Sequence, residues 1–380
     1  MKKLLPEVCT IQYGFPFDSA KFSDSNGMPL IRIRDVVRGY SETYTTEEYK
    51  SEYIVHENDL LIGMDGEFNI AKWGKTPALL NQRVCRLAPK DSIDKDYLFY
   101  FMPIALKRIE EKTPFVTVKH LSAKELNKIE IPVLSLEEQR KIAETLSKVD
   151  ELIAFREQQL AKLDELVKAR FVEMFGDLVA PQCEYPELKL VDICADADDI
   201  KCGPFGTQLN RDEYKAKGVA VWEIPQINSG FSEMPTHFIT EEKAVILNAY
   251  SIEPGDIAMS RKGNVGKCGL FPENLKKGII HSDVLRIRVD KRKVDSCFMM
   301  YQLHFSEAVK RQIEMVSSGA IMAGINVTKL KQIKVRIPEL ENQRMFAAFV
   351  ERVDQQKQRV QKSLEKLELM KKALMQEYFG

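Results

Sequence analysis

One stretch of this sequence occurs twice. Aligned with itself at an offset of 204 residues, the segment that starts at residue 126 matches the segment that starts at residue 330 without a gap. Glu-Glu-Gln-Arg at 137–140 falls on Glu-Asn-Gln-Arg at 341–344, and Phe-Gly at 175–176 falls on the final Phe-Gly. Because the register holds along the whole segment, the sequence predicts a pseudo-twofold internal repeat.

Each copy of the repeat has the pattern of a short strand, a proline loop and a long helix. In the first copy Ser135 is placed to cap the helix, Glu137 and Glu138 lie in its first turn, and Gly176 follows its end. Apolar residues recur along it at heptad spacing, which is typical of a coiled coil. The predicted seam residues are Leu146, Ile153, Leu160, Leu163 and Val167 in the first copy and Val353, Val360, Leu364, Leu367 and Leu374 in the second.

Four basic residues interrupt this seam. One interpretation of Arg156, Arg170, Lys357 and Lys371 is that their long stems lie along the seam edge. The alternative is that they fix the register or meet acidic groups of a partner. The first copy carries 8 basic and 11 acidic residues, and the second carries 11 basic and 7 acidic residues. Opposite net charges favour packing of the two helices on each other. The second helix must then run back antiparallel to the first and end near the N-terminal part of the chain.

The repeat divides the chain into four expected parts: 1–125, 126–177, 178–329 and 330–380. The two globular parts contain the same patterns in the same order. Residues 27–36 and 218–227 both alternate like a half-buried strand, and 55–66 and 252–263 both combine a turn, an acidic residue, an apolar strand and a glycine loop. The loop residues differ between the two parts. A common framework with different loops indicates one task performed on two targets.

Together, these strings resemble the DNA-specificity (S) subunit of type I restriction-modification systems. The resemblance rests on "IPVLSLEEQR" with its copy "RIPELENQR", and on "GMPLIRIRDV" paired with "GVAVWEIPQI", and it covers essentially the whole chain. Two departures lie in the second half, where no Asp matches Asp35 and the proline loop has one proline.

The resemblance implies an α/β fold in which two target-recognition domains are separated by a long antiparallel helical pair, a coiled coil. Each domain would read one half of a split sequence in double-stranded DNA. Two modification subunits, which methylate adenine with S-adenosylmethionine, would dock on the chain, and restriction subunits would join in some assemblies. The chain itself would perform no chemistry, and it would bind no cofactor.

The motifs agree with a chain that is not an enzyme. Gly-Lys-Thr at 74–76 lacks the upstream glycine of a phosphate loop, and Cys268 replaces the hydroxyl residue that should follow Lys267. No Asn/Asp-Pro-Pro-Tyr string is present. Seven scattered cysteines and five histidines form no metal pattern, so we expect reduced, mostly buried thiols and no metal. We see no signal peptide and no apolar run of membrane-spanning length, so we expect a cytoplasmic protein without a membrane partner.

Candidate DNA contacts are the polar and basic side chains on loops at the ends of predicted strands. Arginine and lysine suit phosphates and guanine, and asparagine and glutamine suit adenine. For any one of them the alternative is an ordinary solvated side chain. The candidates are Arg32, Arg34, Lys72, Asn81, Gln82, Arg83, Thr117 and Lys119 in the first part and Gln208, Asn210, Arg211, Gln226, Arg261, Lys262, Asn264, Lys267, Ser317 and Asn326 in the second.

Aromatic residues add a second kind of candidate. Trp73, Trp222, Phe205 and Tyr214 could stack on an unpaired base, with core packing as the alternative that the strand pattern favours for Trp222.

A rival interpretation is a non-catalytic coiled-coil scaffold with two ligand- or protein-binding modules. The net charge is zero, with 56 basic and 56 acidic residues, whereas nucleic-acid-binding proteins are usually basic. The family resemblance outweighs this observation, because partner subunits could supply the basic surface around DNA.

Overall fold

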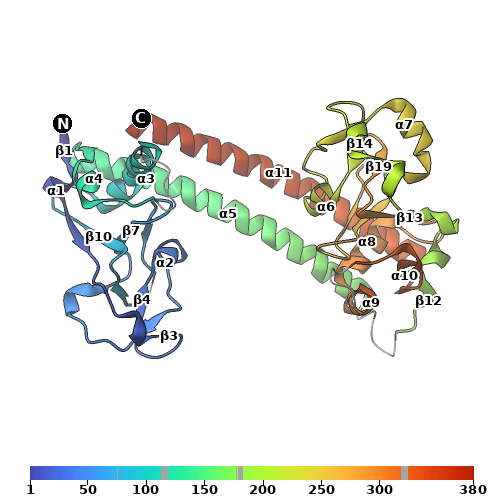
Figure 1. Ribbon diagram of the computed structural model, residues 1–380, viewed down its shortest axis with the longest axis horizontal. Helices are drawn as coiled ribbons and strands as arrows, with labels where there is room; N and C mark the ends of the chain where they lie inside the picture. The colour runs from blue at the N-terminus through green and yellow to red at the C-terminus, as the bar shows by residue number, and fades with distance from the viewer. Residues whose placement is uncertain (75, 113–118, 177, 179–182, 318–323) are drawn as a thin grey trace. The chain divides into compact units, whose positions relative to one another are not determined.

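The computed structural model describes residues 1–74, 76–112, 119–176, 178, 183–317 and 324–380. They form two compact units, which we call unit 1 (Met1–Gln158 with Gln361–Gly380) and unit 2 (Gln159–Val360). Two long helices, α5 (Leu136–Phe175) and α11 (Leu340–Phe379), each contribute one part to unit 1 and the other part to unit 2 (Figure 1).

Unit 1 is built on two main sheets. The antiparallel four-stranded sheet has the order β2 (Cys9–Tyr13), β10 (Val84–Pro89), β7 (Leu60–Gly63) and β8 (Ile70–Lys72). The five-stranded sheet has the order β3 (Phe22–Ser23), β5 (Tyr44–Thr45), β4 (Met28–Ile31), β9 (Ala78–Leu80) and β6 (Ile54–Val55). Strands β1 (Lys2–Leu4) and β11 (Glu130–Pro132) pair separately. The helices are α1 (Leu5–Val8), α2 (Ile33–Arg38), α3 (Lys95–Lys112) and α4 (Ala123–Asn127), with 3₁₀ turns at Ser19–Lys21 and Ser51–Tyr53.

Unit 2 repeats this plan. One sheet has the order β13 (Ile200–Cys202), β20 (Val284–Ile287), β17 (Ile257–Ser260) and β18 (Cys268–Leu270). The other has the order β15 (His237–Ile239), β14 (Val219–Trp222), β19 (Gly278–Ile280) and β16 (Ser251–Ile252), and β12 (Glu187–Lys189) pairs with β21 (Lys334–Arg336). The helices are α6 (Ile224–Asn228), α7 (Glu241–Ile246), α8 (Ser296–Phe305), α9 (Glu307–Ser317) and α10 (Val327–Lys331). Turns of 3₁₀ helix lie at Leu190–Ile193, Ala197–Asp199, Gly206–Gln208, Arg211–Glu213 and Asn248–Tyr250.

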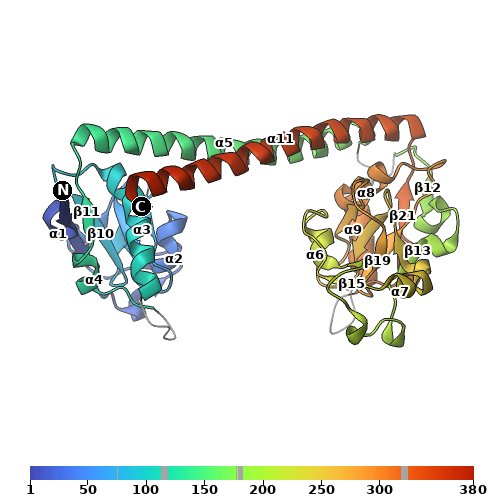
Figure 2. The same cartoon turned by 90° about the horizontal axis from the view of Figure 1, so that it is seen from above.

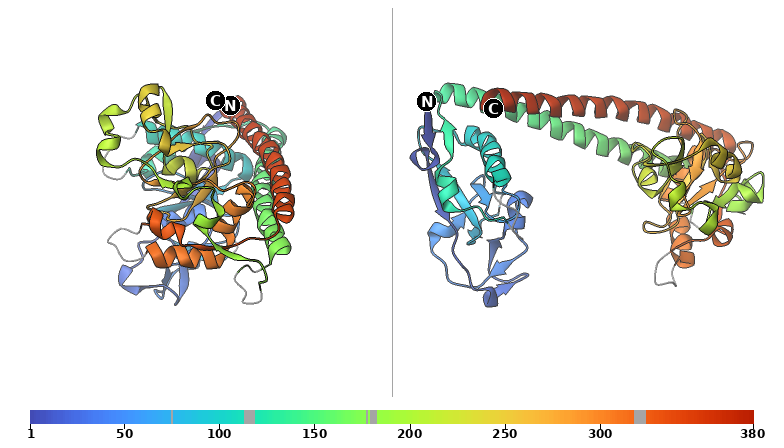
Figure 3. Two further views of the ribbon diagram at one scale, coloured as in Figure 1. Left: turned by 90° about the vertical axis from the view of Figure 1, so that its right-hand side faces the viewer. Right: turned by 45° about the horizontal axis from the view of Figure 1, so that its top comes forward.

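The end of each long helix is an anchor in a core. Phe379, at the end of α11, is buried in unit 1, where its ring centroid lies 5.2 Å from that of Tyr97 on α3. Figure 2 shows the end of α11 beside α3, and Figures 1 and 3 show both chain ends on unit 1. The repeat partner Phe175, at the end of α5, is buried in unit 2, 4.7 Å from the ring of Phe298 on α8. The predicted return of the second helix to the first part of the chain is confirmed.

The start of each long helix is also built in the same way. The buried Gln139 accepts the N–H of Asp94 at 2.8 Å and donates to the carbonyl of Leu134 at 2.9 Å. Its repeat partner Gln343 accepts the N–H of Asp295 at 2.9 Å and donates to the Pro338 carbonyl at 2.7 Å. Asp94 and Asp295 in turn accept the first N–H groups of α3 and α8. The shared glutamine of the two repeated strings therefore joins each long helix to its globular part.

The predicted cap is present at the start of the first long helix. Ser135 and Glu138 exchange hydrogen bonds, with Ser135 Oγ accepting the Glu138 N–H at 3.2 Å. These bonds hold the pKa of the Glu138 carboxyl below its usual value. Gly176 takes a left-handed φ of 66° after the end of α5. The ten predicted seam residues are all buried or half-buried.

Three of the basic seam residues meet groups on the opposite helix. Within unit 1 Lys371 lies 2.6 Å from Asp150, and within unit 2 Lys357 lies 2.6 Å from Asp164. Arg170 of α5 lies over the ring of Phe349 of α11, 5.8 Å from its centroid. In unit 2 the contact further along α5, at Arg170, is made by the earlier residue of α11, Phe349, and the contact at Asp164 is made by the later residue, Lys357. The two helices are therefore antiparallel there. Of the two interpretations of the lysines, the one in which they fix the register fits these ion pairs.

One strand prediction is wrong in its second half. Strand β4 ends at Ile31 and α2 begins two residues later, and β14 and α6 do the same in unit 2. The cause is a side chain in the third helical position. Asp35 accepts the N–H of Arg32 at 2.8 Å, and Gln226 accepts the N–H of Glu223 at 3.1 Å, so each closes a helical turn. Gln226 thus takes over in unit 2 the role that Asp35 has in unit 1.

Candidate nucleic-acid interface

The framework brings three loops together at the same place in each unit. In unit 1 the parallel strands β4 and β9 lead into Arg32 and into residues 81–83, and β7 leads into residues 64–66. In unit 2 the parallel strands β14 and β19 lead into Glu223 and into residues 281–283, and β17 leads into residues 261–263. The carboxyl ends of parallel strands are a common place for ligand sites. We call these loops the strand-end loops of each unit.

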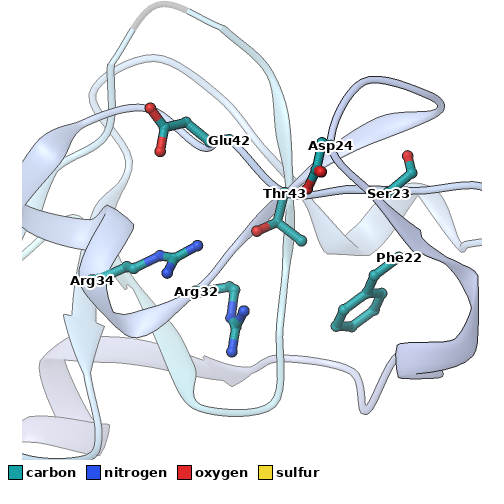
Figure 4. A pocket seen from close by; sticks show the side chains of 7 residues that line it. All are labelled: Phe22, Ser23, Asp24, Arg32, Arg34, Glu42 and Thr43. Carbon is teal, nitrogen blue, oxygen red and sulfur yellow. The ribbon is translucent and has the colours of Figure 1, made fainter.

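The first strand-end loop of unit 1 opens onto a pocket. Arg32 and Arg34 are exposed there, and Arg34 Nε lies 3.7 Å from the buried Asp35 carboxylate. The pocket has a volume of about 440 Å³, and Figure 4 shows the side chains that line it: Phe22, Ser23, Asp24, Arg32, Arg34, Glu42 and Thr43. The structure therefore brings two of the predicted DNA contacts together.

The other two strand-end loops of unit 1 are tied to each other by charge. Arg83 Nε lies 3.5 Å from Asp65, which also bonds the ring of His120. Gln82 is exposed, and Asn81 turns its side chain back to accept the N–H of Gln82 at 2.8 Å. These three predicted residues share the loop at 81–83.

Two other predicted contacts of this unit are engaged elsewhere. Lys72 pairs with Asp96 at 2.9 Å and lies over the ring of Phe99, and Lys119 pairs with Glu110 at 3.3 Å. Their charges are met within the protein, so they are weaker candidates than Arg32. Thr117 lies outside the described residues.

In unit 2 the glycine-containing loop at 260–267 is held by its own arginine. Arg261 Nε donates to the Ile325 carbonyl at 3.1 Å, and its guanidinium lies 4.7 Å from the centre of the Phe205 ring. Lys262 pairs with Asp283 at 2.9 Å. Asn264 is exposed and Lys267 is half-buried. Arg261 is therefore placed to position this loop, while Asn264 is the member of the loop that is free to meet a ligand.

The remaining predicted contacts in unit 2 have local roles. Gln208 accepts the N–H of Phe205 at 3.0 Å, Ser317 donates to the Glu314 carbonyl at 3.1 Å, and Asn326 caps α10 by accepting the N–H of Lys329 at 2.8 Å. Asn210 and Arg211 are exposed on a turn. The prediction for Gln226 is wrong, because its side chain is 3% exposed and is used to cap α6.

Two of the four aromatic candidates belong to the protein interior. Trp73 and Trp222 are 2% and 3% exposed, so stacking of either on a base is ruled out in this conformation. Tyr214 is stacked on His237 with ring centroids 4.6 Å apart. Phe205 is 49% exposed, under the guanidinium of Arg261.

Nucleophilic and metal chemistry have little support in the described residues. All seven cysteines are free, and burial raises the pKa of Cys9, Cys85, Cys194 and Cys268 to about 12. These thiols are therefore protonated at neutral pH. Within the described ranges no group of His, Cys, Asp or Glu side chains is arranged to hold a metal ion. No helix among those described has an apolar stretch long enough to cross a bilayer.

Sequence reasoning missed the acidic and histidine residues of the same loops. Glu223 has two histidine neighbours. Its carboxylate bonds His237 Nδ1 at 2.7 Å and lies 3.9 Å from His281 Nε2. Asp65 and Asp283 anchor the two ion pairs described above. Aligning the loops of the two globular parts with each other would have pointed to these positions, because the loops occupy equivalent places in the shared framework.

Comparisons with known proteins cover nearly the whole chain. The family model described as the type I restriction modification DNA specificity domain matches residues 1–165 and again 199–369. The chain is 28% identical over 376 residues to the EcoBI specificity subunit of Escherichia coli, covering 92% of this chain and 78% of the relative. It is 25% identical to the MjaVIII specificity subunit of Methanocaldococcus jannaschii, covering 91% and 87%.

Solved structures show the same fold. The S subunit of a type I restriction-modification system from M. genitalium superposes with a TM-score of 0.61 at 17% identity, covering 99% of this chain and 94% of that one. A chain from a study of complex assembly and conformational transition in the type I system superposes with a TM-score of 0.60 at 17% identity, covering 100% and 97%. The α/β fold, its internal repeat and its antiparallel helical pair are confirmed, and the chain belongs to the type I restriction-modification DNA-specificity family.

Proposed function

We propose that this chain is the specificity subunit of a type I restriction-modification system and that it recognises a two-part sequence in double-stranded DNA. Residues 1–125 read one half of the target and residues 178–329 read the other. The observation that carries this assignment is the duplication: the same framework presents three strand-end loops twice, with different residues on them. The specificity subunits among its relatives support the same role.

The chain contributes recognition, and partner subunits contribute chemistry. Two modification subunits dock on it and hold the S-adenosylmethionine used to methylate adenine, and restriction subunits complete the assembly. Support for two docking places comes from the helices. Leu166 of unit 2 is 45% exposed, and Met370, its equivalent at an offset of 204 residues, is 43% exposed in unit 1. A contiguous exposed apolar patch marks a protein–protein contact, whereas a single exposed apolar residue is ordinary, so these two equivalent positions are starting points for locating the docking surfaces.

The first experiment is sequencing of methylated bases in a host that carries this chain with its cognate modification subunits. We expect one motif made of two short sequences separated by an unread spacer. The modification subunits without this chain should methylate no defined motif, and the purified chain alone should transfer no methyl groups. Methyl transfer by the chain alone would contradict the division of labour.

A binding experiment separates this function from the rival scaffold. The formal net charge of the chain is zero, so the chain has no overall electrostatic attraction for DNA. We expect random duplex to bind the assembled complex at low salt, and to bind it more weakly as salt rises. Failure of both the chain and the complex to bind duplex would favour a scaffold for other ligands.

The helical pair is proposed to set the spacing between the two half-sites. Each long helix has 40 residues, or roughly 60 Å at 1.5 Å per residue. Inserting one heptad at matched positions of both helices keeps the seam facing its partner and adds about 10.5 Å. This length corresponds to roughly 3 base pairs. We expect a longer spacer in the methylated motif, or loss of methylation; full activity at the original spacing would contradict the role.

A further inference from the structure

The pocket at the first strand-end loop of unit 1 contains unpaired groups of both charges. Arg32 is exposed, and among the described residues its bond to Asp35 is made by its backbone N–H and not by its guanidinium. Asp24 is also exposed, without an ion pair in the described part of the chain. Figure 4 shows Arg32 between Arg34 and the ring of Phe22, with Thr43 and Asp24 on the other side of the opening. The pocket thus offers guanidinium donors, a carboxylate acceptor and an apolar wall.

This mixture favours a base pair over a phosphate. A phosphate would be attracted by Arg32 and Arg34, but it would also face the carboxylate of Asp24 and that of Glu42, which lies 3.5 Å from Arg38. The major-groove edge of a guanine–cytosine pair instead presents two acceptors, guanine O6 and N7, beside one donor, cytosine N4. Arginine is the usual partner of the two guanine atoms, and a carboxylate is the usual partner of cytosine N4. The charges that line the pocket match this edge.

At the position of Arg32, unit 2 has a different residue but the same hydrogen bond to its backbone N–H. Strand registers place Ile31 beside Leu80 and Trp222 beside Ile280, so the next residues, Arg32 and Glu223, are equivalent. The N–H groups of both are held in the same way, by Asp35 and by Gln226. The side chains, however, are of opposite charge. A position with a constant support and a variable side chain is what two readers of different sequences require.

We propose that this pocket binds the major-groove edge of a guanine–cytosine pair in the half-site read by unit 1. Arg32 donates to guanine O6 and N7, Asp24 accepts from cytosine N4, and Arg34 flanks the pair. Arg32 is accordingly a specificity-determining residue. The inference rests on the proposed function, because it names the base pair recognised by one of its two domains.

The test uses the assembled complex and duplexes altered at one atom. The methylated motif is determined first, and the half that persists when residues 178–329 are exchanged is assigned to unit 1. Each guanine of that half is then replaced by 7-deazaguanine, which lacks the N7 acceptor. At one of these positions the wild-type complex should lose roughly 10- to 100-fold in affinity. The Arg32→Ala complex should bind the unaltered duplex that much more weakly and should not respond to the replacement.

Matched controls separate recognition from general charge and from folding. Lys50→Ala removes another exposed cation from unit 1, outside the pocket and 3.9 Å from Glu52, and it should respond to 7-deazaguanine like the wild type. The melting temperature of Arg32→Ala should stay near that of the wild type, because the side chain is exposed and unpaired.

Two outcomes would overturn the inference alone. One is a unit 1 half-site without guanine, or with guanines that tolerate 7-deaza replacement. The other is an Arg32→Ala complex that binds all duplexes uniformly more weakly, with a salt slope reduced by about 1, because this is the signature of a phosphate contact. A wild-type complex that methylates no two-part motif would instead contradict the proposed function itself.

Discussion

Units 1 and 2 share a framework but carry opposite charges at one ion pair. Strand pairing places Val84 opposite Gly63 and Val284 opposite Ser260, so Asp65 and Lys262 occupy equivalent positions, as do Arg83 and Asp283. In unit 1 the acid lies on the loop after β7 and the base lies before β10, whereas in unit 2 the two are exchanged. The two units therefore keep a link between two strand-end loops while reversing the charges that each loop presents. A duplicated framework can in this way serve two different targets.

The comparison is tested most strongly at the ends of the long helices. Phe175→Ala should destabilise unit 2, and Phe379→Ala should destabilise unit 1, each by about 3–5 kcal/mol, because each ring is buried in one core. Amide hydrogen exchange resolved by segment distinguishes the two units. Val172→Ala, on an exposed face of α5, is the control and should change little. Equal loss of protection in both units from either variant would break the assignment of one anchor to each unit.

The glutamines at the helix starts are expected to have the next largest effect. Gln139→Leu and Gln343→Leu leave buried hydrogen-bonding groups without partners, and each should cost about 1–3 kcal/mol. Urea unfolding of each variant measures the loss. If Gln343→Leu were neutral while Gln139→Leu was not, the two helix starts would not be equivalent despite their shared sequence.

A smaller effect is expected where the residue type differs but the role is shared. Asp35→Ala and Gln226→Ala each remove the side chain that closes a helical turn after the central strand, so each should lower the free energy of unfolding by about 1–2 kcal/mol. Thermal unfolding is a sufficient measurement, and Asp24→Ala, an exposed acid of the same unit, is the control. If Asp35→Ala lowered the stability and Gln226→Ala did not, the glutamine would not stabilise its helical turn as the aspartate does.

How far the sequence predicts this molecule depends on the distance over which each signal acts. The repeat, the cap at Ser135 and the heptad seam were predicted because they are local or periodic patterns. The helical turn after β4 was missed, because Asp35 was interpreted from its alternation with neighbours and not as a capping side chain. The ion pair between Lys72 and Asp96 joins a strand to a helix that is distant in the sequence, so no local pattern predicts it. The same holds for Arg261, whose loop position predicted a free cation but whose guanidinium binds the Ile325 carbonyl.

The smallest expected effect is at the reversed ion pair itself. Asp65→Lys places a cation beside Arg83 and should cost about 0.5–1 kcal/mol at low salt and less at high salt, because the pair is partly exposed. The double variant Asp65→Lys/Arg83→Asp, which installs the charge order of unit 2, should recover the part of the loss that comes from Arg83, while the bond between Asp65 and His120 stays broken. A double-mutant cycle on melting temperature measures the coupling. No recovery would mean that the link depends on the local loops and is not a property of the shared framework.

The most direct test of the central claim, two independent readers on one framework, is replacement of residues 178–329 by the corresponding residues of a relative. The measurement is the methylated motif in a host that carries the hybrid and the cognate modification subunits. Because unit 1 and both long-helix repeats are retained, we expect one half of the motif to change while the other half and the spacer remain. A change in both halves, or an unchanged motif, would contradict the account.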